Sequence, residues 1–142
     1  MGKRLEFPAS PTIVRKLRAE VRGLAAELGA TAEASDQLAL VADEIVNNAI
    51  EHGTSYRRSG KLLALQVAVD GARLRVEFFD PEMPIELVGQ LADALAAVSR
   101  DLPALESERG RGLFLLTVYL QELRADLEPS GGLRLVGYIG AP

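Results

Sequence analysis

Apolar residues recur at helical spacing through the first third of the chain. The first stripe consists of Ile13, Val14, Leu17, Val21, Leu24 and Leu28. Ser10 and Pro11 precede this stripe and Gly29 follows it, so the pattern predicts an amphipathic helix capped by Ser10. A second helix is predicted from about residue 33 to residue 52, because its apolar positions again form one stripe before Gly53.

Later in the chain, shorter apolar runs are separated by turn residues. Residues 62–69 and 74–79 flank an Asp-Gly turn, which predicts a β-hairpin. Residues 124–128 and 133–139 flank a Ser-Gly-Gly turn and predict a second hairpin. The remaining predicted elements are an edge strand at 3–7 and helices at 85–99 and 112–120.

Strands that meet in hairpins, with helices grouped between them, predict an α+β fold. We expect a two-layer α/β sandwich in which helices pack on one face of a mixed, mostly antiparallel sheet. At 142 residues the chain has room for one such domain, spanning residues 1–142.

Charge and composition narrow the classes of function. Sixteen Lys and Arg against 20 Asp and Glu give a net charge of -4, which offers no general attraction for nucleic acid or an anionic membrane. With no Cys and one His, any metal is expected to be hard and oxygen-ligated. No signal peptide and no apolar run of about 20 residues is present, so a cytoplasmic location is expected.

The helix predicted at 33–52 carries a polar cluster in its later turns. Glu44, Asn48 and Glu51 follow helical spacing, so their oxygens project to one side and can meet a cation or water. Magnesium needs few protein ligands when a bound phosphate supplies the other oxygens. A solvated helix face is the alternative, and His52 either satisfies carbonyls at the helix end or contacts a ligand.

A glycine-rich stretch precedes the helix predicted at 112–120. Its residues are Arg109, Gly110, Arg111, Gly112 and Leu113. Glycines let backbone N–H groups approach a phosphate, and a helix N-terminus adds aligned donors. The two arginines can add charge-assisted contacts. The alternative is a loop that leads into a core helix.

Asp80 ends the apolar strand predicted at 74–79. A carboxylate at a strand end can accept a hydrogen bond from an exocyclic amine, as on adenine, or can cap the following turn. The residues alone leave both interpretations open.

Taken together and in this order, the three stretches resemble the nucleotide-binding motifs of the GHKL ATPase superfamily, and in particular those of the anti-sigma-factor serine kinases. The segment from Glu44 to His52 is similar to their N box. Phe79-Asp80-Pro81 stands where the adenine-binding motif is expected, and residues 110–116 look like the glycine-rich lid motif. The resemblance covers essentially the whole chain.

This resemblance implies ATP and Mg²⁺ as cofactors. It makes Glu44 the general base for the attacking hydroxyl, Asn48 the magnesium ligand and Asp80 the adenine anchor, while Gly110 and Gly112 shape a lid over the phosphates. Such a site suits phosphoryl transfer, which depends mostly on positioning and charge stabilisation.

Two stretches depart from the family pattern. Pro81, Glu82, Met83 and Pro84 follow Asp80 where relatives usually carry glycine, so backbone freedom is reduced there. The turn at residues 131–133 lacks the threonine that relatives often pair with glycine.

By the resemblance, the chain is a serine kinase that phosphorylates an anti-sigma-factor antagonist, sequesters a sigma factor and forms a homodimer. A binding module that regulates a partner without catalysis is the alternative, motivated by the altered stretch after Asp80. A histidine-kinase catalytic domain is a third possibility, because it shares the nucleotide site. It needs a partner that carries the acceptor, since the only His of the chain is His52.

Overall fold

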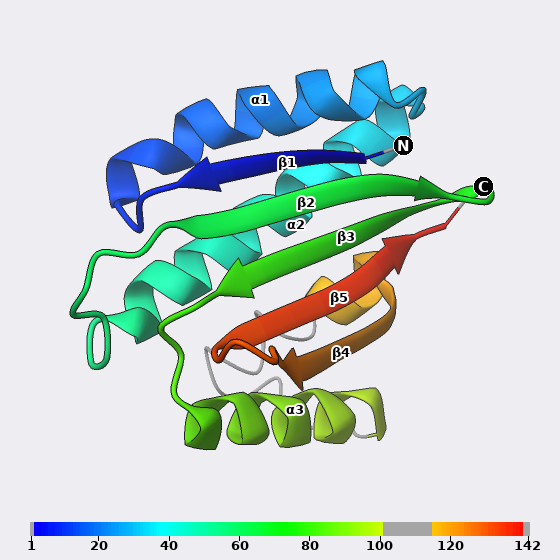
Figure 1. Ribbon diagram of the computed structural model, residues 1–142. Helices are drawn as coiled ribbons and strands as arrows, with labels where there is room; N and C mark the ends of the chain where they lie inside the picture. The colour runs from blue at the N-terminus through cyan, green and yellow to red at the C-terminus, as the bar shows by residue number, and fades with distance from the viewer. Residues whose placement is uncertain (1, 101–114, 141–142) are drawn as a thin grey trace.

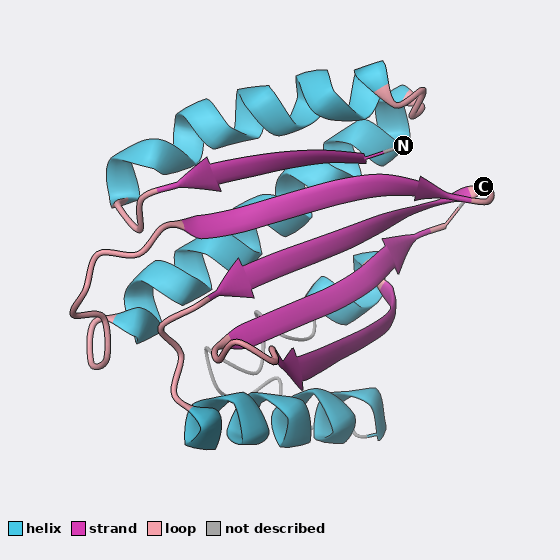
Figure 2. Ribbon diagram, viewed as in Figure 1, coloured by secondary structure: helices cyan, strands magenta, loops and turns pink. Residues whose placement is uncertain are grey.

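The fold is built on an antiparallel sheet with helices on one of its faces (Figures 1 and 2). The computed structural model describes residues 2–100 and 115–140. Its strands are β1 (Gly2–Phe7), β2 (Leu63–Asp70), β3 (Arg73–Asp80), β4 (Gln121–Leu127) and β5 (Leu133–Ile139). They lie in the order β1-β2-β3-β5-β4, and every pairing between these described strands is antiparallel. The predicted α+β sandwich is confirmed, with β1 at an edge.

Both predicted hairpins form, and glycine supplies their turns. β2 and β3 are joined at Gly71, whose φ of 63° lies in the left-handed region that glycine adopts without strain. β4 and β5 are joined through Gly131 and Gly132, with φ of 96° and 94°. β3 and β5 then pair with each other, which sets Asp80 opposite Leu133. No hairpin turn specifies this central pairing, so it is a long-range feature of the fold.

The helices are longer than the strands and cover the sheet from one side. They are α1 (Val14–Glu27), α2 (Ala32–Gly53) and α3 (Ile85–Arg100). α1 packs along α2, α2 crosses behind β2 and β3, and α3 lies beside β4 (Figure 1). Residues 115–119 are also helical, within the stretch predicted at 112–120. Among the residues that the structure describes, no helix has the length and apolar character needed to cross a bilayer.

The starts of the first two helices are specified differently. The predicted side-chain cap by Ser10 is wrong, because its hydroxyl bonds the Thr12 hydroxyl at 3.0 Å and a 3₁₀ turn (Pro11–Ile13) comes before α1. α2 has a true side-chain cap, since Thr31 Oγ1 accepts a hydrogen bond from the Ala34 N–H at 3.1 Å. This cap fixes where the helix with the polar cluster begins.

The hydrophobic core lies between the helices and one face of the sheet. Val21, Leu38, Leu65 and Val67 are all fully buried. Along β2 and β3, core side chains alternate with side chains on the other face of the sheet. That outer face carries charged side chains, among which Glu77 is held between Arg75 and Arg134. The expectation of a single domain over residues 1–142 stays a prediction.

Candidate functional site

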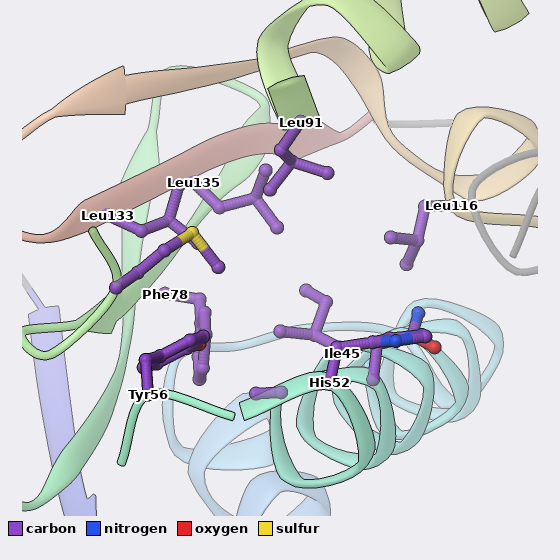
Figure 3. A pocket seen from close by; sticks show the side chains of 11 residues that line it. Ile45, His52, Tyr56, Phe78, Leu91, Leu116, Leu133 and Leu135 are labelled. Atoms are coloured by element: carbon purple, nitrogen blue, oxygen red, sulfur yellow. The ribbon is translucent and has the colours of Figure 1, made fainter. Parts of the chain in front are cut away.

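A small apolar cavity of ≈ 60 Å³ lies between α2 and the sheet. In Figure 3, Ile45 points from α2 toward Leu135 on β5 across this space. Of the residues that the structure describes, three polar side chains also line the cavity, and they are Asn48, His52 and Tyr56. The cavity therefore combines apolar walls with a few polar groups from one end of α2 and the loop after it, an arrangement typical of small-molecule sites.

The polar cluster of α2 divides between the cavity and the solvent. Asn48 lines the cavity and is half-buried, whereas its neighbour Asn47 is exposed. Glu44 lies one turn earlier and is half-buried, but it does not line the cavity. Within the described residues, its carboxylate makes no hydrogen bond or ion pair. Glu51 is exposed, so the three-oxygen cluster predicted for residues 44, 48 and 51 brings only Asn48 to the cavity wall.

Asp80 has no exposed surface, and its carboxylate is surrounded by donors. Its Oδ2 accepts from the Tyr56 hydroxyl at 2.6 Å and from Arg57 Nη2 at 2.9 Å. Its Oδ1 accepts from Arg57 Nη1 at 3.1 Å and from the Glu82 backbone N–H at 3.2 Å. The bond to the Glu82 N–H is the turn-capping contact that the sequence left open for Asp80. Because Asp80 is also absent from the cavity wall, its carboxylate is covered in this conformation.

Arg57 ties the end of β3 to α2. Besides its bidentate pair with Asp80, its Nη2 donates to the carbonyl oxygen of Ala49 at 3.2 Å. A guanidinium presents several donors in one plane, which suits simultaneous contact with a carboxylate and a carbonyl. The side chain also lies directly against Gly53, where an added Cβ would collide with it. The glycine that ends α2 thus makes room for this ion pair.

Glu82 holds the following loop in place. Its Oε1 accepts from the Ser59 hydroxyl at 2.5 Å, the Ser59 N–H at 2.7 Å and the Arg58 N–H at 3.1 Å. These hydrogen bonds, led by the one from the Ser59 hydroxyl, lower the pKa of Glu82 to about 2. The stretch after Asp80 that departs from the family pattern therefore has a structural role, since it fastens the loop that follows α2.

A sequence profile of the histidine kinase-like ATPase domain matches residues 7–135. The match extends over nearly all of the chain. The chain belongs to this family. Membership confirms the resemblance to the GHKL superfamily that the N-box segment and Asp80 indicated, and it implies an ATP-binding fold.

Two individual proteins are similar to this histidine kinase-like domain. The anti-sigma F factor of Clostridium acetobutylicum is 24% identical over 132 residues, which are 93% of this chain and 88% of that protein. A chain in the crystal structure of the SiaB–SiaC complex from Pseudomonas aeruginosa has a TM-score of 0.70 at 16% identity. That comparison covers 96% of this chain and 88% of the other, and it shows a shared fold.

Some of the residues that resemble the family's motifs lie among the described residues, and others do not. Glu44, Asn48 and Asp80 come from α2 and from the end of β3, on either side of the loop fastened by Glu82. The glycine-rich residues 109–113 lie outside the described residues. Leu116, just after them, is buried and lines the cavity. The catalytic and nucleotide-binding roles of all these residues stay predictions.

Sequence reasoning missed Tyr56, Arg57 and Glu82. The loop after α2 contains a Tyr-Arg-Arg run that begins four positions after the end of the N-box segment. That run was the available signal, because a strand-end carboxylate as buried as Asp80 requires a charged partner. Glu82 was noted only as a departure from the family pattern.

A metal site made wholly of protein groups is absent from the described part of the chain, which contains no group of three His, Cys, Asp or Glu side chains suited to an ion. The half-buried carboxamide of Asn48 on the cavity wall fits a magnesium ion whose other oxygens come from phosphate and water. The donor set is therefore compatible with Mg²⁺ carried by a nucleotide.

Proposed function

We propose that this chain is an ATP- and magnesium-dependent serine kinase that phosphorylates an anti-sigma-factor antagonist and also sequesters a sigma factor. The proposal places it in the cytoplasm as a homodimer. The name of the anti-sigma F factor, to which the chain is 24% identical, supports this class of regulator. The membership of this chain in the histidine kinase-like ATPase domain family supports the use of ATP.

The observation that carries the proposal is the meeting of the N-box helix with the end of β3. The side chain of Arg57 bridges the Ala49 carbonyl on α2 and the Asp80 carboxylate on β3. Asn48, next to Ala49, lines the cavity beside this junction. Asn48 lines the apolar cavity, and Tyr56 on its wall contacts Asp80, which is 32 positions after Asn48. This closeness of the two motifs supports a nucleotide site at the cavity.

Each residue has a distinct task in this proposal. Asn48 supplies an oxygen to magnesium, which neutralises charge on the phosphates when it is bound with ATP. Asp80 accepts from the amine of adenine and thereby orients the nucleotide. Glu44 accepts the proton of the attacking serine hydroxyl as its oxygen bonds to the γ-phosphorus, and ADP leaves. Gly110 and Gly112 provide backbone donors for the phosphates.

The first test is calorimetric titration of ATP with and without magnesium. Wild type is expected to bind ATP more tightly with magnesium, and Asn48→Ala should lose most of this magnesium dependence because it lacks the carboxamide oxygen. Asn47→Ala is the matched control, since Asn47 is exposed one position away on the same helix. Equal magnesium dependence in all three proteins would contradict the metal role of Asn48.

A second test examines transfer to serine. With a purified anti-sigma-factor antagonist and Mg·ATP, wild type should produce acid-stable phosphoserine, and Glu44→Gln should lower the rate by about 10²-fold or more. Glu51→Gln is the matched control, because Glu51 is exposed on the same helix. Acid-labile phosphohistidine on a partner would instead indicate a histidine-kinase domain.

A regulatory module without catalysis is the second candidate function. The observation that favours it is the covered carboxylate of Asp80, which already has four protein donors. Under this candidate, the chain binds its partner protein equally well with and without ATP, and no phosphate is transferred. Loss of transfer in Glu44→Gln would exclude it.

A further inference from the structure

The carboxylate of Asp80 has no free acceptor position. Two carboxylate oxygens offer about four lone-pair positions in total. Tyr56 and Arg57 fill those of Oδ2, and Arg57 and the Glu82 N–H fill those of Oδ1. If an exocyclic amine is to bond this carboxylate, one of the present donors must leave first.

The three donor residues differ in how readily they can leave. The Glu82 N–H belongs to the backbone turn at the end of β3, and Glu82 itself is held by Ser59 and Arg58. Arg57 carries the charge that compensates a fully buried carboxylate, and removing it would leave that charge unpaired. The Tyr56 hydroxyl is neutral, so replacing it by a neutral amine keeps both the charge balance and the number of hydrogen bonds. Tyr56 is therefore the donor whose exchange costs least.

Tyr56 is also in the right place. Its side chain lines the cavity, whereas Asp80 does not, so Tyr56 stands between the cavity and the carboxylate. Burial, followed by the hydrogen bond to Asp80, raises the pKa of Tyr56. A tyrosine hydroxyl is protonated at neutral pH even without this shift, so it acts as a donor to the carboxylate.

We infer that Tyr56 is an internal competitor for the base site: its hydroxyl occupies the acceptor position on Asp80 Oδ2 that the exocyclic amine of a purine takes when the nucleotide binds. The inference rests on the proposed function, because it assumes that ATP enters this cavity. It adds a gating residue that lowers the affinity for ATP and leaves Arg57 in place as the permanent countercharge.

The test compares Tyr56→Phe with wild type in calorimetric titrations of Mg·ATP and of the magnesium complex of purine riboside triphosphate, which lacks the exocyclic amine. Removing the hydroxyl frees one acceptor position, so Tyr56→Phe should bind ATP about tenfold more tightly, and purine riboside triphosphate by less than about twofold. Tyr138→Phe is the matched control, because Tyr138 lies under Arg73 on the outer face of the sheet, and its ATP affinity should equal that of wild type.

A measurement on the wild type makes the test independent of the variant's folding. With ¹³Cζ-labelled tyrosine, the NMR resonance of Tyr56 should move when Mg·ATP is added, because its hydrogen bond to Asp80 is lost, while that of Tyr138 should stay unchanged. An unmoved Tyr56 resonance at saturating ATP would overturn the inference.

The outcomes separate the gate from the function. If wild type binds ATP and folded Tyr56→Phe binds it equally or more weakly, Tyr56 does not compete with the nucleotide. The proposed kinase function is unaffected by that result. A gain that is equally large for purine riboside triphosphate overturns competition with the amine. If neither protein binds ATP, both the competing role of Tyr56 and the kinase proposal fail.

Discussion

Glu82 stabilises the loop after α2 through a single carboxylate oxygen that accepts three hydrogen bonds. The pKa of Glu82 is lowered from its ordinary value of 4.5 to about 2 in the folded chain. The stabilisation is therefore fully present above about pH 4.5 and is lost as the pH falls toward 2, because the unfolded chain takes up the proton first. We expect the free energy of unfolding, measured by urea denaturation, to fall across this window.

Glu82→Gln should reduce stability at pH 6 and should flatten the slope between pH 4.5 and pH 3, because its amide cannot titrate. Glu51→Gln serves as the control, since the Glu51 carboxylate makes no hydrogen bond or ion pair within the described residues. If Glu82→Gln keeps the full slope of wild type, the carboxylate of Glu82 is not the source of this acid sensitivity.

At the scale of elements, the β4–β5 hairpin is pressed against the end of β3. At Gly132, an added Cβ would lie 2.5 Å from the Asp80 carbonyl oxygen and 2.6 Å from Pro81 Cα. Gly131 has nearly the same φ, but an added Cβ there meets nothing within 4 Å. Gly131→Ala should therefore cost only the left-handed backbone strain of about 1–2 kcal/mol, and Gly132→Ala should cost at least about twice as much.

Urea denaturation of both variants checks this prediction, and the pair is matched in residue type, turn and φ. Equal losses would mean that the turn can move away from β3 without penalty. Both glycines lie in the same turn with nearly the same φ. A greater loss of stability in Gly132→Ala would therefore come from the contact between this turn and the end of β3.

At the scale of the whole molecule, the proposed ATP site joins α2 to β3, so ligand binding and folding are coupled. A ligand that binds only the folded chain stabilises it by about 2.7 kcal/mol at 100 times its dissociation constant. Mg·ATP should therefore raise the midpoint of thermal unfolding of wild type by several degrees. In Asn48→Ala the shift at the same concentrations should be smaller, and an undiminished shift would contradict binding at this cavity.

The amino-acid sequence by itself predicted the first two helices, the two hairpins and part of the candidate site. Helical spacing predicted α1 and α2, and Asp-Gly and Ser-Gly-Gly turns predicted the two hairpins, because these signals act between residues close in the chain. The same local regularity predicted that Asn48 and Glu44 lie a turn apart on one helix.

Only the tertiary structure decided which side chain meets which across the fold. The β3–β5 pairing and the covering of Asp80 by Tyr56 and Arg57 depend on how the loop after α2 folds back onto the end of β3. The chain contains 16 Lys and Arg, and spacing along the sequence does not select one of them as the partner of Asp80. That selection arises from packing, since a buried carboxylate is stable only where the folded chain brings a compensating charge and enough donors to it.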